Sequence, residues 1–313
     1  MVMNNYLAAW ESHFTKNRPF LLSFSFRLTG SFSEAEDMVQ EAFLACAGTD
    51  PATVSHHRSW LTKVCANKSL DLLKSAAKKR ETYPGTWLPD AVPDVFQYWG
   101  NIEEGISPDK KLLNEETFTT GALIMIQKLT PEERVIWIMS DVLDYSFQEI
   151  GELLKKSEEA CKKTAQRARL AFNNLRRNNL YSEESMNVIR KFYALASAGD
   201  AEGLEAMFAP DAEMWSDGGG KVSVSSMKIL TDVKRMAKFI AGIWTAPFMN
   251  TPNVKQEYAA VNRMNGQVIS RLTSEGVWVL ETVSSIEVVD GKITRIYAQR
   301  NPDKLNALFI PHS

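Results

Sequence analysis

Residues 129–172 read LTPEERVIWIMSDVLDYSFQEIGELLKKSEEACKKTAQRARLAF, and this stretch decides the fold of the middle of the chain. Ser146 and Glu149 form the pattern of a capping box, which opens a short helix that ends near Leu154. After a turn of about three residues, Ser157 caps a longer basic helix. A short helix, a tight turn and a longer basic helix are typical of a helix-turn-helix.

The longer helix is predicted to run to about Asn178, and its periodicity separates two faces. The apolar stripe that faces the core consists of Ala160 or Cys161, Ala165, Ala168, Phe172 and Leu175. The polar residues left for the outside are Lys162, Lys163, Gln166, Arg167 and Arg169. A preceding helix is predicted to start at Thr130, because Pro131 favours a first turn and Glu133 completes the cap.

Residues 33–47 predict another amphipathic helix, which Ser33 and Glu36 open with a capping box. Its buried stripe at helical spacing consists of Ala35, Met38, Val39, Ala42, Phe43 and Cys46. Its opposite, exposed face carries Asp37, Gln40 and Glu41.

The net charge of −2 conceals two basic segments. Residues 58–80 contain seven basic residues and one acidic residue, and residues 155–177 contain eight basic and two acidic residues. Residues 81–116 between them contain eight acidic and two basic residues. Two basic helical segments joined by an acidic connector are typical of a nucleic-acid-binding protein, although a single basic run is as often a solvated helix surface.

Composition divides the 313 residues into four parts. Residues 1–80 are helical, residues 81–111 form a linker rich in Pro, Gly and aromatic residues, and residues 112–180 are a second helical unit. The aromatic side chains of the linker predict that it lies against another part of the protein. Residues 181–313 combine helices with alternating β-branched runs. The predicted fold class is therefore multi-domain, with two all-α domains followed by an α+β domain.

Within the last part, helices are predicted over residues 183–198, 200–208 and near 229–244. The dipeptides Asn265-Gly266 and Asp290-Gly291 predict hairpin turns between strands.

The sequence also excludes several classes of protein. Cys46, Cys65 and Cys161 have no paired spacing and are predicted to be small buried apolar residues, not a disulfide framework or a metal site. No apolar run approaches the roughly 18 residues of a membrane span, and the N-terminus lacks the pattern of a secretory signal. We therefore expect a cytoplasmic protein with no cofactor, no metal and no membrane association.

Three stretches, which belong to two regions, resemble the sigma-70 superfamily. RLTGSFSEAEDMVQEAFLACAG (27–48) looks like the region 2 helix, and SWLTKVCANKSLDLLKSAAKKRE (59–81) resembles the segment that follows it. Residues 129–172 are similar to region 4. The order of the two regions and the short linker resemble the extracytoplasmic-function group, which lacks the intermediate domain. The resemblance implies a transcription initiation factor whose partners are bacterial core RNA polymerase and promoter DNA.

The resemblance also implies roles for individual residues. Asp37, Gln40 and Glu41 match the face that docks on the largest polymerase subunit, where an ordinary solvated helix face is the alternative. The residues that match the reader of the −10 element are Trp60, Lys63, Asn67, Lys68, Lys74 and Lys78, together with Lys79 and Arg80. Cations suit phosphates, and aromatic or polar side chains suit splayed bases, although Trp60 is equally suited to the core.

In region 4 the resemblance places the second helix in the major groove of the −35 element. The residues that match its DNA-facing positions are Lys162, Lys163, Gln166 and Arg167, with Arg169 beside them. Lys155 departs from the family, which often has Gly in this turn. A left-handed lysine costs about 1 kcal/mol.

The C-terminal part resembles SnoaL-like proteins, in which helices cover a cone-shaped sheet. The stretch FYALASAGDAEGLEAMFAPDAEMWSDGGGKV (192–222) carries this resemblance, and the whole chain resembles a subgroup of extracytoplasmic-function sigma factors bearing this domain. In that subgroup the extension is thought to replace a separate anti-sigma protein. Three motifs support the match: YPGTWLP (83–89), with Thr86 where Pro is usual, DGGGK (217–221) and NPDKL (301–305).

We hypothesise that these three motifs contact one another and hold the two helical domains in a fixed arrangement. The residues expected to make these regulatory contacts are Tyr83, Gly85, Trp87, Leu88, Pro89, Asp217, Gly218, Gly219, Gly220, Lys221, Asn301, Pro302, Asp303, Lys304 and Leu305. DGGGK lacks the spacing and the hydroxyl residue of a phosphate-binding loop, and a glycine-rich turn is the better interpretation.

The sequence leaves some functions open. The SnoaL-like fold hosts both enzymes and binding modules, and the only histidine of this part is His312, so no His/Asp acid–base pair is available. We expect no catalytic residue, a monomer when free, and a small-molecule ligand in the cone as an option. The alternative function is a helix-turn-helix transcription regulator whose cone is a small-molecule sensor or an enzyme, which leaves Asp37, Gln40 and Glu41 unexplained.

Overall fold

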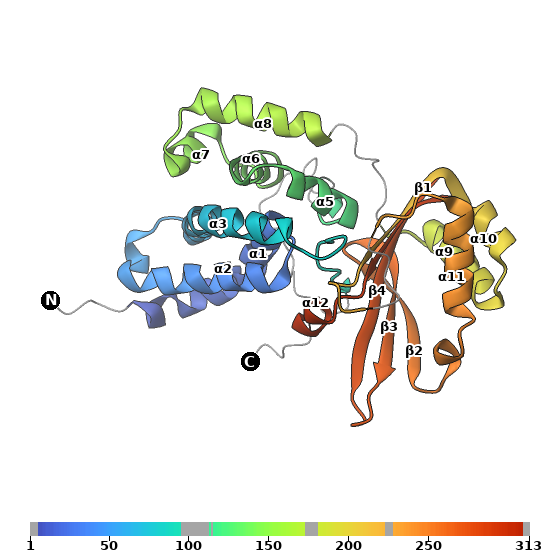
Figure 1. The fold of residues 1–313 in the computed structure, drawn as a ribbon. Helices are drawn as coiled ribbons and strands as arrows, with labels where there is room; N and C mark the ends of the chain where they lie inside the picture. The colour runs from blue at the N-terminus through green and yellow to red at the C-terminus, as the bar shows by residue number, and fades with distance from the viewer. Residues whose placement is uncertain (1–5, 95–112, 114, 173–180, 223–227, 309–313) are drawn as a thin grey trace. The chain divides into compact units, whose positions relative to one another are not determined.

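The computed structural model describes residues 6–94, 113, 115–172, 181–222 and 228–308, shown as a ribbon in Figure 1. The chain forms two compact units. Unit 1 contains residues 1–81, 97–117 and 121–175, and unit 2 contains residues 82–96, 118–120 and 176–313. The first part of the linker therefore belongs to the same unit as the C-terminal domain.

Unit 1 is helical. Its described elements are α1 (Leu7–Thr29), α2 (Phe32–Ala45), η1 (Cys46–Gly48), η2 (Pro51–Thr53), α3 (His57–Glu81), α5 (Thr120–Lys128), α6 (Pro131–Trp137), the π turn η4 (Ile138–Val142), α7 (Phe147–Leu154) and α8 (Glu158–Phe172). The second half of α1 is buried almost all round, with Phe24, Phe26 and Leu28 fully inaccessible. A helix segment that is buried on every side must be enclosed by its neighbours, and α2 and α3 pack against it.

The capping box predicted at Ser33 is wrong. Helix α2 begins at Phe32, and its N-cap is Ser31, which makes no side-chain capping hydrogen bond. The hydroxyl of Thr29 donates to the carbonyl of Ser31, so a tight turn between α1 and α2 replaces the box. Phe32 is then buried as the first residue of the apolar stripe.

The predicted helix-turn-helix is confirmed. Ser146 and Glu149 form both hydrogen bonds of the capping box that starts α7, and the hydroxyl of Ser157 accepts from the amide of Ala160 at the start of α8. Lys155 ends α7 in the left-handed conformation, with φ 55°. The predicted end of the long helix near Asn178 lies outside the described residues.

Buried arginines join helices within unit 1. Arg134 of α6 donates from Nη1 to the carbonyl of Leu28 at 2.9 Å, and Arg27 of α1 donates from Nε to the hydroxyl of Thr117 at 2.9 Å. Burial lowers the pKa of Arg134 to about 10, which still leaves it charged at neutral pH. The bond from Arg134 satisfies a backbone carbonyl at the end of α1 that the helix itself leaves unpaired.

Unit 2 is an α+β domain, which confirms the predicted fold class. Its elements are α9 (Glu183–Ala198), α10 (Ala201–Met207), β1 (Phe208–Asp217), α11 (Val233–Trp244), η5 (Pro247–Asn250), β2 (Val254–Val261), β3 (Met264–Leu272), β4 (Trp278–Val289), β5 (Lys292–Gln299) and α12 (Pro302–Ala307). The sheet order is β1-β5-β4-β3-β2, with β1 parallel to β5 and the other pairs antiparallel. Helices α9, α10 and α11 lie on one side of the strongly curved sheet (Figure 1).

One of the two predicted hairpin turns is misplaced. The turn between β4 and β5 is Asp290-Gly291, as predicted, with φ of 50° and 73°. The turn between β2 and β3 is instead Asn262-Arg263, both at positive φ, and Gly266 pairs with Ala259 inside the sheet. A Cβ on Gly266 would lie 2.1 Å from a backbone oxygen of β4, so this glycine permits close strand approach.

The three cysteines are buried free thiols, as predicted. Burial raises the pKa of Cys46 to about 11 and that of Cys65 to about 12, so almost no reactive thiolate is present near neutral pH. We therefore expect a thiol reagent at pH 8 to leave the native protein nearly unlabelled and to label three thiols after denaturation. Rapid stoichiometric labelling of the native protein would contradict these buried positions.

Among the described residues, no helix has both the length and the apolar character needed to cross a membrane.

Candidate functional site

Asp217 is the last residue of β1, and its carboxylate is fully buried in unit 2. It accepts hydrogen bonds from the phenol of Tyr83 at 2.5 Å, the amide of Leu88 at 3.0 Å and the ammonium of Lys304 at 2.8 Å. Two of these donors belong to the linker and the third belongs to α12. One carboxylate therefore joins three segments that lie far apart in the sequence.

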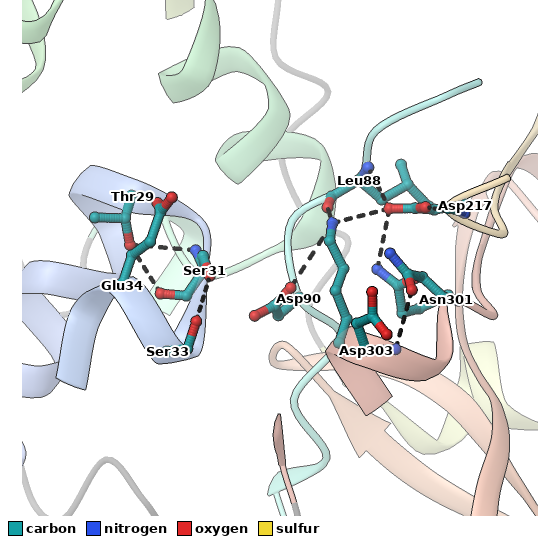
Figure 2. Close-up of polar contacts among 12 residues, drawn as sticks. Thr29, Ser31, Ser33, Glu34, Leu88, Asp90, Asp217, Asn301 and Asp303 are labelled. Atoms are coloured by element: carbon teal, nitrogen blue, oxygen red, sulfur yellow. Dashed lines mark hydrogen bonds and ion pairs between the residues drawn. The ribbon is translucent and has the colours of Figure 1, made fainter. Parts of the chain in front are cut away.

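Lys304 closes the other side of the same cluster. Its ammonium also donates to the carbonyl of Leu88 and lies 3.8 Å from the carboxylate of Asp90. The rings of Trp87 and Tyr83 flank it, with centroids at 4.4 Å and 5.4 Å. Figure 2 shows Leu88 and Asp90 of the linker close to Asp217 and Asn301. The linker thus wraps around a buried cation.

Asn301 holds the linker from a third direction. Its amide donates to the phenol oxygen of Tyr83 at 2.7 Å. A Cβ on Gly219 would meet the amide of Asn301 at 2.5 Å, and a Cβ on Gly220 would meet the ring of Pro84 at 3.0 Å. The glycines of DGGGK therefore allow the turn after β1 to approach both segments closely. We call Tyr83, Leu88, Asp217, Asn301 and Lys304 the Asp217 cluster.

The other residues of the three motifs lie around this cluster. Lys221 and Asp303 form an exposed ion pair at 2.6 Å, and Gly85 has a φ of 85°. Pro302 starts α12, and Leu305 is buried beneath it. Pro89 is buried in the linker, and the carbonyl of Gly218 accepts from the amide of Lys221.

The electrostatics of the cluster keep Tyr83 a neutral donor. Burial, followed by the hydrogen bond to the carboxylate of Asp217 and its negative charge, raises the pKa of Tyr83 above its ordinary value. A phenolate at this position would face that carboxylate directly. The proton therefore stays on Tyr83, where it bridges the linker to the sheet.

Gly219 offers a direct test of the close approach. We expect Gly219→Ala to destabilise unit 2 by about 1–3 kcal/mol, because a left-handed alanine is strained and its Cβ displaces Asn301. Gly291→Ala is the matched control, since Gly291 has a similar φ of 73° but no atom within 4 Å of the added Cβ. Denaturant unfolding should show the larger loss for Gly219→Ala. An equal loss in the two variants would contradict a specific contact with Asn301.

A second anchor of the linker was missed by sequence reasoning. The amide of Val92 donates to the side chain of Asn262 at 3.0 Å, and Asn262 donates in turn to the carbonyls of Val92 and Asp90. Arg263 forms an ion pair with Asp94 at 3.3 Å. Because the sequence pattern favoured a turn at Asn265-Gly266, nothing in it marked the true turn as a binding element.

The same turn also holds the segment that leads into α5. The hydroxyl of Thr120 accepts from the side-chain amide of Asn262 at 3.2 Å and shares a hydrogen bond with Ser285 of β4 at 3.0 Å. Unit 2 therefore binds the chain at two places, just after α3 and just before the body of α5.

The residues predicted to bind polymerase lie on one face of α2. Asp37, Gln40 and Glu41 are all exposed. Glu41 lies 3.5 Å from the ammonium of Lys68 on α3, a solvent-exposed pair of little energetic weight. The carboxylates of this face therefore stay accessible to a basic partner.

The residues predicted to read the −10 element divide into two groups on α3. Asn67, Lys68 and Lys74 are exposed. Trp60 is half-buried and stacks on Trp10 at 4.7 Å, and Lys63 lies 4.0 Å from Glu149 of α7. The side chains of Lys78 and Lys79 lie outside the described set.

Arg80 does not serve as a free cation for DNA phosphates. Its guanidinium donates to the carbonyl of Thr29 and to Gln127, and it lies 3.4 Å from Glu34. It is thus part of the packing within unit 1, since carbonyl oxygens at a helix end attract a buried arginine.

Helix α8 presents the residues predicted to contact the −35 element. Lys162, Lys163, Gln166, Arg167 and Arg169 are all exposed. Their ion pairs link Lys162 to Glu158 and Lys163 to Glu159 within the helix, Arg167 to Glu133, and Arg169 to Asp141. The two pairs within the helix are exposed on both sides and contribute about 0–1 kcal/mol each, so a nucleic-acid phosphate can replace their carboxylates. Among the described residues, no cluster of side chains suits a metal ion.

Comparison with known proteins identifies three matching families. Residues 13–79 match the family described as Sigma-70 region 2, residues 124–172 match Sigma-70 region 4, and residues 189–296 match the SnoaL-like domain.

Relatives match over nearly the whole chain. It is 30% identical over 301 residues to the ECF RNA polymerase sigma factor SigJ of Mycobacterium tuberculosis, covering 94% of this chain and 92% of that protein. It is 26% identical over 310 residues to the probable ECF RNA polymerase sigma factor SigI of the same species, covering 96% and 95%. The crystal structure of SigJ superimposes with a TM-score of 0.69 at 26% identity, covering 94% of this chain and 98% of that chain.

Proposed function

The chain belongs to the ECF RNA polymerase sigma factors, and we propose that its SnoaL-like domain regulates transcription initiation in cis by binding the linker. As a sigma factor it directs RNA polymerase to promoters, and the family is not a family of enzymes. The Asp217 cluster is the regulatory element in this proposal.

The observation that carries the proposal is the position of Leu88 between Asp217 and Lys304. The carboxylate accepts from the amide of Leu88, and the ammonium donates to its carbonyl. Release of the linker would take a donor from a buried carboxylate and an acceptor from a buried ammonium, and such unsatisfied buried groups are unfavourable. The linker therefore cannot leave the cluster without exposing or rearranging both charges.

The segments that unit 2 binds are directly connected to the helices of region 2 and region 4. The bound segment follows the end of α3 at Glu81, and the segment held through Thr120 leads into α5. A domain that holds both segments restricts how far region 2 and region 4 can separate. We propose that the Asp217 cluster sets this restriction, and that promoter binding depends on it.

We further propose the individual contacts made during initiation. Asp37, Gln40 and Glu41 bind core polymerase, because they form an exposed acidic and polar face on α2. The exposed polar residues of α3 bind the −10 element, and those of α8 bind the −35 element. Their cations neutralise phosphates, and the amides of Asn67 and Gln166 are suited to bases.

The regulatory proposal is tested with full-length Tyr83→Phe, which removes the phenol from the cluster but keeps the ring. Tyr181→Phe is the matched control, because Tyr181 is exposed. Losing one bond to a buried carboxylate, worth about 1–2 kcal/mol, should raise the population of released linker about 5–30-fold. Limited proteolysis within residues 82–94 measures release, and transcription in vitro with bacterial core polymerase and a pool of genomic promoters measures the consequence.

We expect Tyr83→Phe alone to be cleaved faster in the linker and to change the yield of transcripts. Faster cleavage with unchanged transcripts would reject regulation through the linker. Unchanged cleavage would reject the Asp217 cluster as the set of contacts that holds the linker.

A second proposal concerns the cone, whose concave side contains a cavity. We propose that it binds a small molecule without catalysing a reaction. Glu281, the carboxylate that lines the cavity, is paired with Arg271 at 2.5 Å and is therefore poorly placed to act as a free base.

A further inference from the structure

The cavity of the cone has an aromatic wall and a mixed floor. Phe192 and Tyr193 of α9, Phe239 and Trp244 of α11, and Phe248 of η5 form the wall. Strands β1, β3, β4 and β5 supply the floor. The cavity has a volume of about 90 Å³. Because a cavity for one water has about 10–15 Å³ of such space, this cavity suits a single ring and not a long chain. Flat aromatic walls favour a flat aromatic guest.

The floor contains a buried amide oxygen that lacks a partner. Gln267 pairs with Ser284 on the neighbouring strand, and Oε1 of Gln267 is buried without a hydrogen bond. The hydroxyl of Ser284 bonds with Tyr193 at 3.1 Å and with the backbone carbonyl of Gln267 at 3.3 Å, so it is already occupied. Buried polar groups are seldom left unpaired, and a glutamine amide offers a donor and an acceptor side by side. A hydroxyl group, which can donate a hydrogen bond to this oxygen, is its natural complement.

The same cavity carries an excess positive charge. Arg300 and Glu281 line it, and Arg271 is paired with Glu281. Glu281 is closely paired with Arg271 at 2.5 Å, whereas the guanidinium of Arg300 lies 3.8 Å away, beyond hydrogen-bond distance. Two guanidinium groups thus share one carboxylate. Burial lowers the pKa of Arg300, the charge of Glu281 raises it, and the charge of Arg271 lowers it, so an additional anion beside Arg300 would favour its charged form.

We propose that the cavity binds a single-ring aromatic carboxylate that carries a hydroxyl group. The carboxylate pairs with Arg300, the ring packs against the aromatic wall, and the hydroxyl bonds with the amide of Gln267. This inference rests on the proposed role of the cone as a binding module. It names the class of molecule that the module takes.

The test is isothermal titration of the full-length protein with three probes: 4-hydroxybenzoate, benzoate and methyl 4-hydroxybenzoate. The ester lacks the negative charge, and benzoate lacks the hydroxyl. We expect 4-hydroxybenzoate to bind about 10–100-fold more tightly than its ester and about 3–10-fold more tightly than benzoate. Equal affinity for the acid and its ester, or binding of none of the three, would overturn the proposal.

Two variants assign each preference to its residue. Arg300→Met should abolish the preference for the acid over the ester but keep the preference for the hydroxyl. Gln267→Leu should abolish the preference for 4-hydroxybenzoate over benzoate but keep the preference for the acid over the ester. Arg190→Met is the control, because Arg190 is an exposed arginine of α9 that does not line the cavity. Since each readout is a ratio of affinities within one variant, a general loss of stability cannot imitate it. A preference for the acid that survives in Arg300→Met would contradict the assignment.

The result is independent of the linker experiment. If no probe binds but Tyr83→Phe still changes transcription, regulation in cis stands and only the ligand is rejected. If the probes bind as expected but Tyr83→Phe changes nothing, the cone is a binding module without the proposed regulatory contact.

Discussion

Lys304→Met is expected to destabilise unit 2 by about 3–5 kcal/mol, because it leaves the carboxylate of Asp217 buried without its cation. Lys304 is 14% exposed and Asp217 is inaccessible, so solvent screens their interaction poorly. Denaturant unfolding of the full-length protein measures the loss. The linker should become sensitive to protease in the same variant, since the carbonyl of Leu88 loses its donor.

The control and the second arm of this experiment lie in the same cluster. Lys221→Met removes an exposed pair with Asp303 and should cost less than about 1 kcal/mol. The double variant Asp217→Leu/Lys304→Met removes both charges, and we expect it to be more stable than Lys304→Met alone. The single variant Asp217→Leu completes the cycle. A loss of stability in the double variant equal to the sum of the losses in Asp217→Leu and Lys304→Met would show that the two charges are not coupled.

The second large effect concerns α8. The triple variant Lys162→Ala/Lys163→Ala/Arg167→Ala is expected to weaken promoter binding by the holoenzyme about 100-fold or more. If all three side chains contact phosphates, the slope of log K against log salt concentration should fall in magnitude by about 2.7. A smaller change in slope with an equal loss of affinity would assign one of them to a base.

The measurement is promoter affinity at several salt concentrations, with a promoter identified by transcription in vitro. The matched control removes three exposed basic residues of unit 2, Arg190, Lys191 and Lys234, and should leave affinity and slope unchanged. Equal effects of the two triple variants would mean that α8 contributes only general positive charge. An unaffected α8 variant would reject it as the −35 reader.

Much of unit 1 could be predicted because its signals are local. Ser146, Glu149 and Ser157 act on backbone amides within three residues of themselves, so the short motif alone determines where α7 and α8 begin. The failure at Ser33 has a tertiary cause. Ser31 and Ser33 both suit a cap, and the burial of Phe32 against the rest of unit 1 decided between them.

The turn between β2 and β3 could not be predicted in this way. Asn265-Gly266 has the stronger turn propensity, but Gly266 is needed where β3 and β4 approach closely. Register follows the burial of whole strand faces, and Met264 is fully buried as the first residue of β3. The turn is therefore formed by Asn262-Arg263, and these two residues also form the second anchor of the linker.

The sequence by itself determined the helix-turn-helix, the exposed faces of α2 and α8, and the α+β character of the last domain. Only the tertiary structure decided that Asp217, Lys304 and Leu88 meet around one buried charge, and that Gln267 and Arg300 share one cavity. Helix signals act between residues one turn apart, so they can be read along the chain. The Asp217 cluster joins residues separated by more than eighty positions, and such contacts exist only after the sheet has brought its strands together.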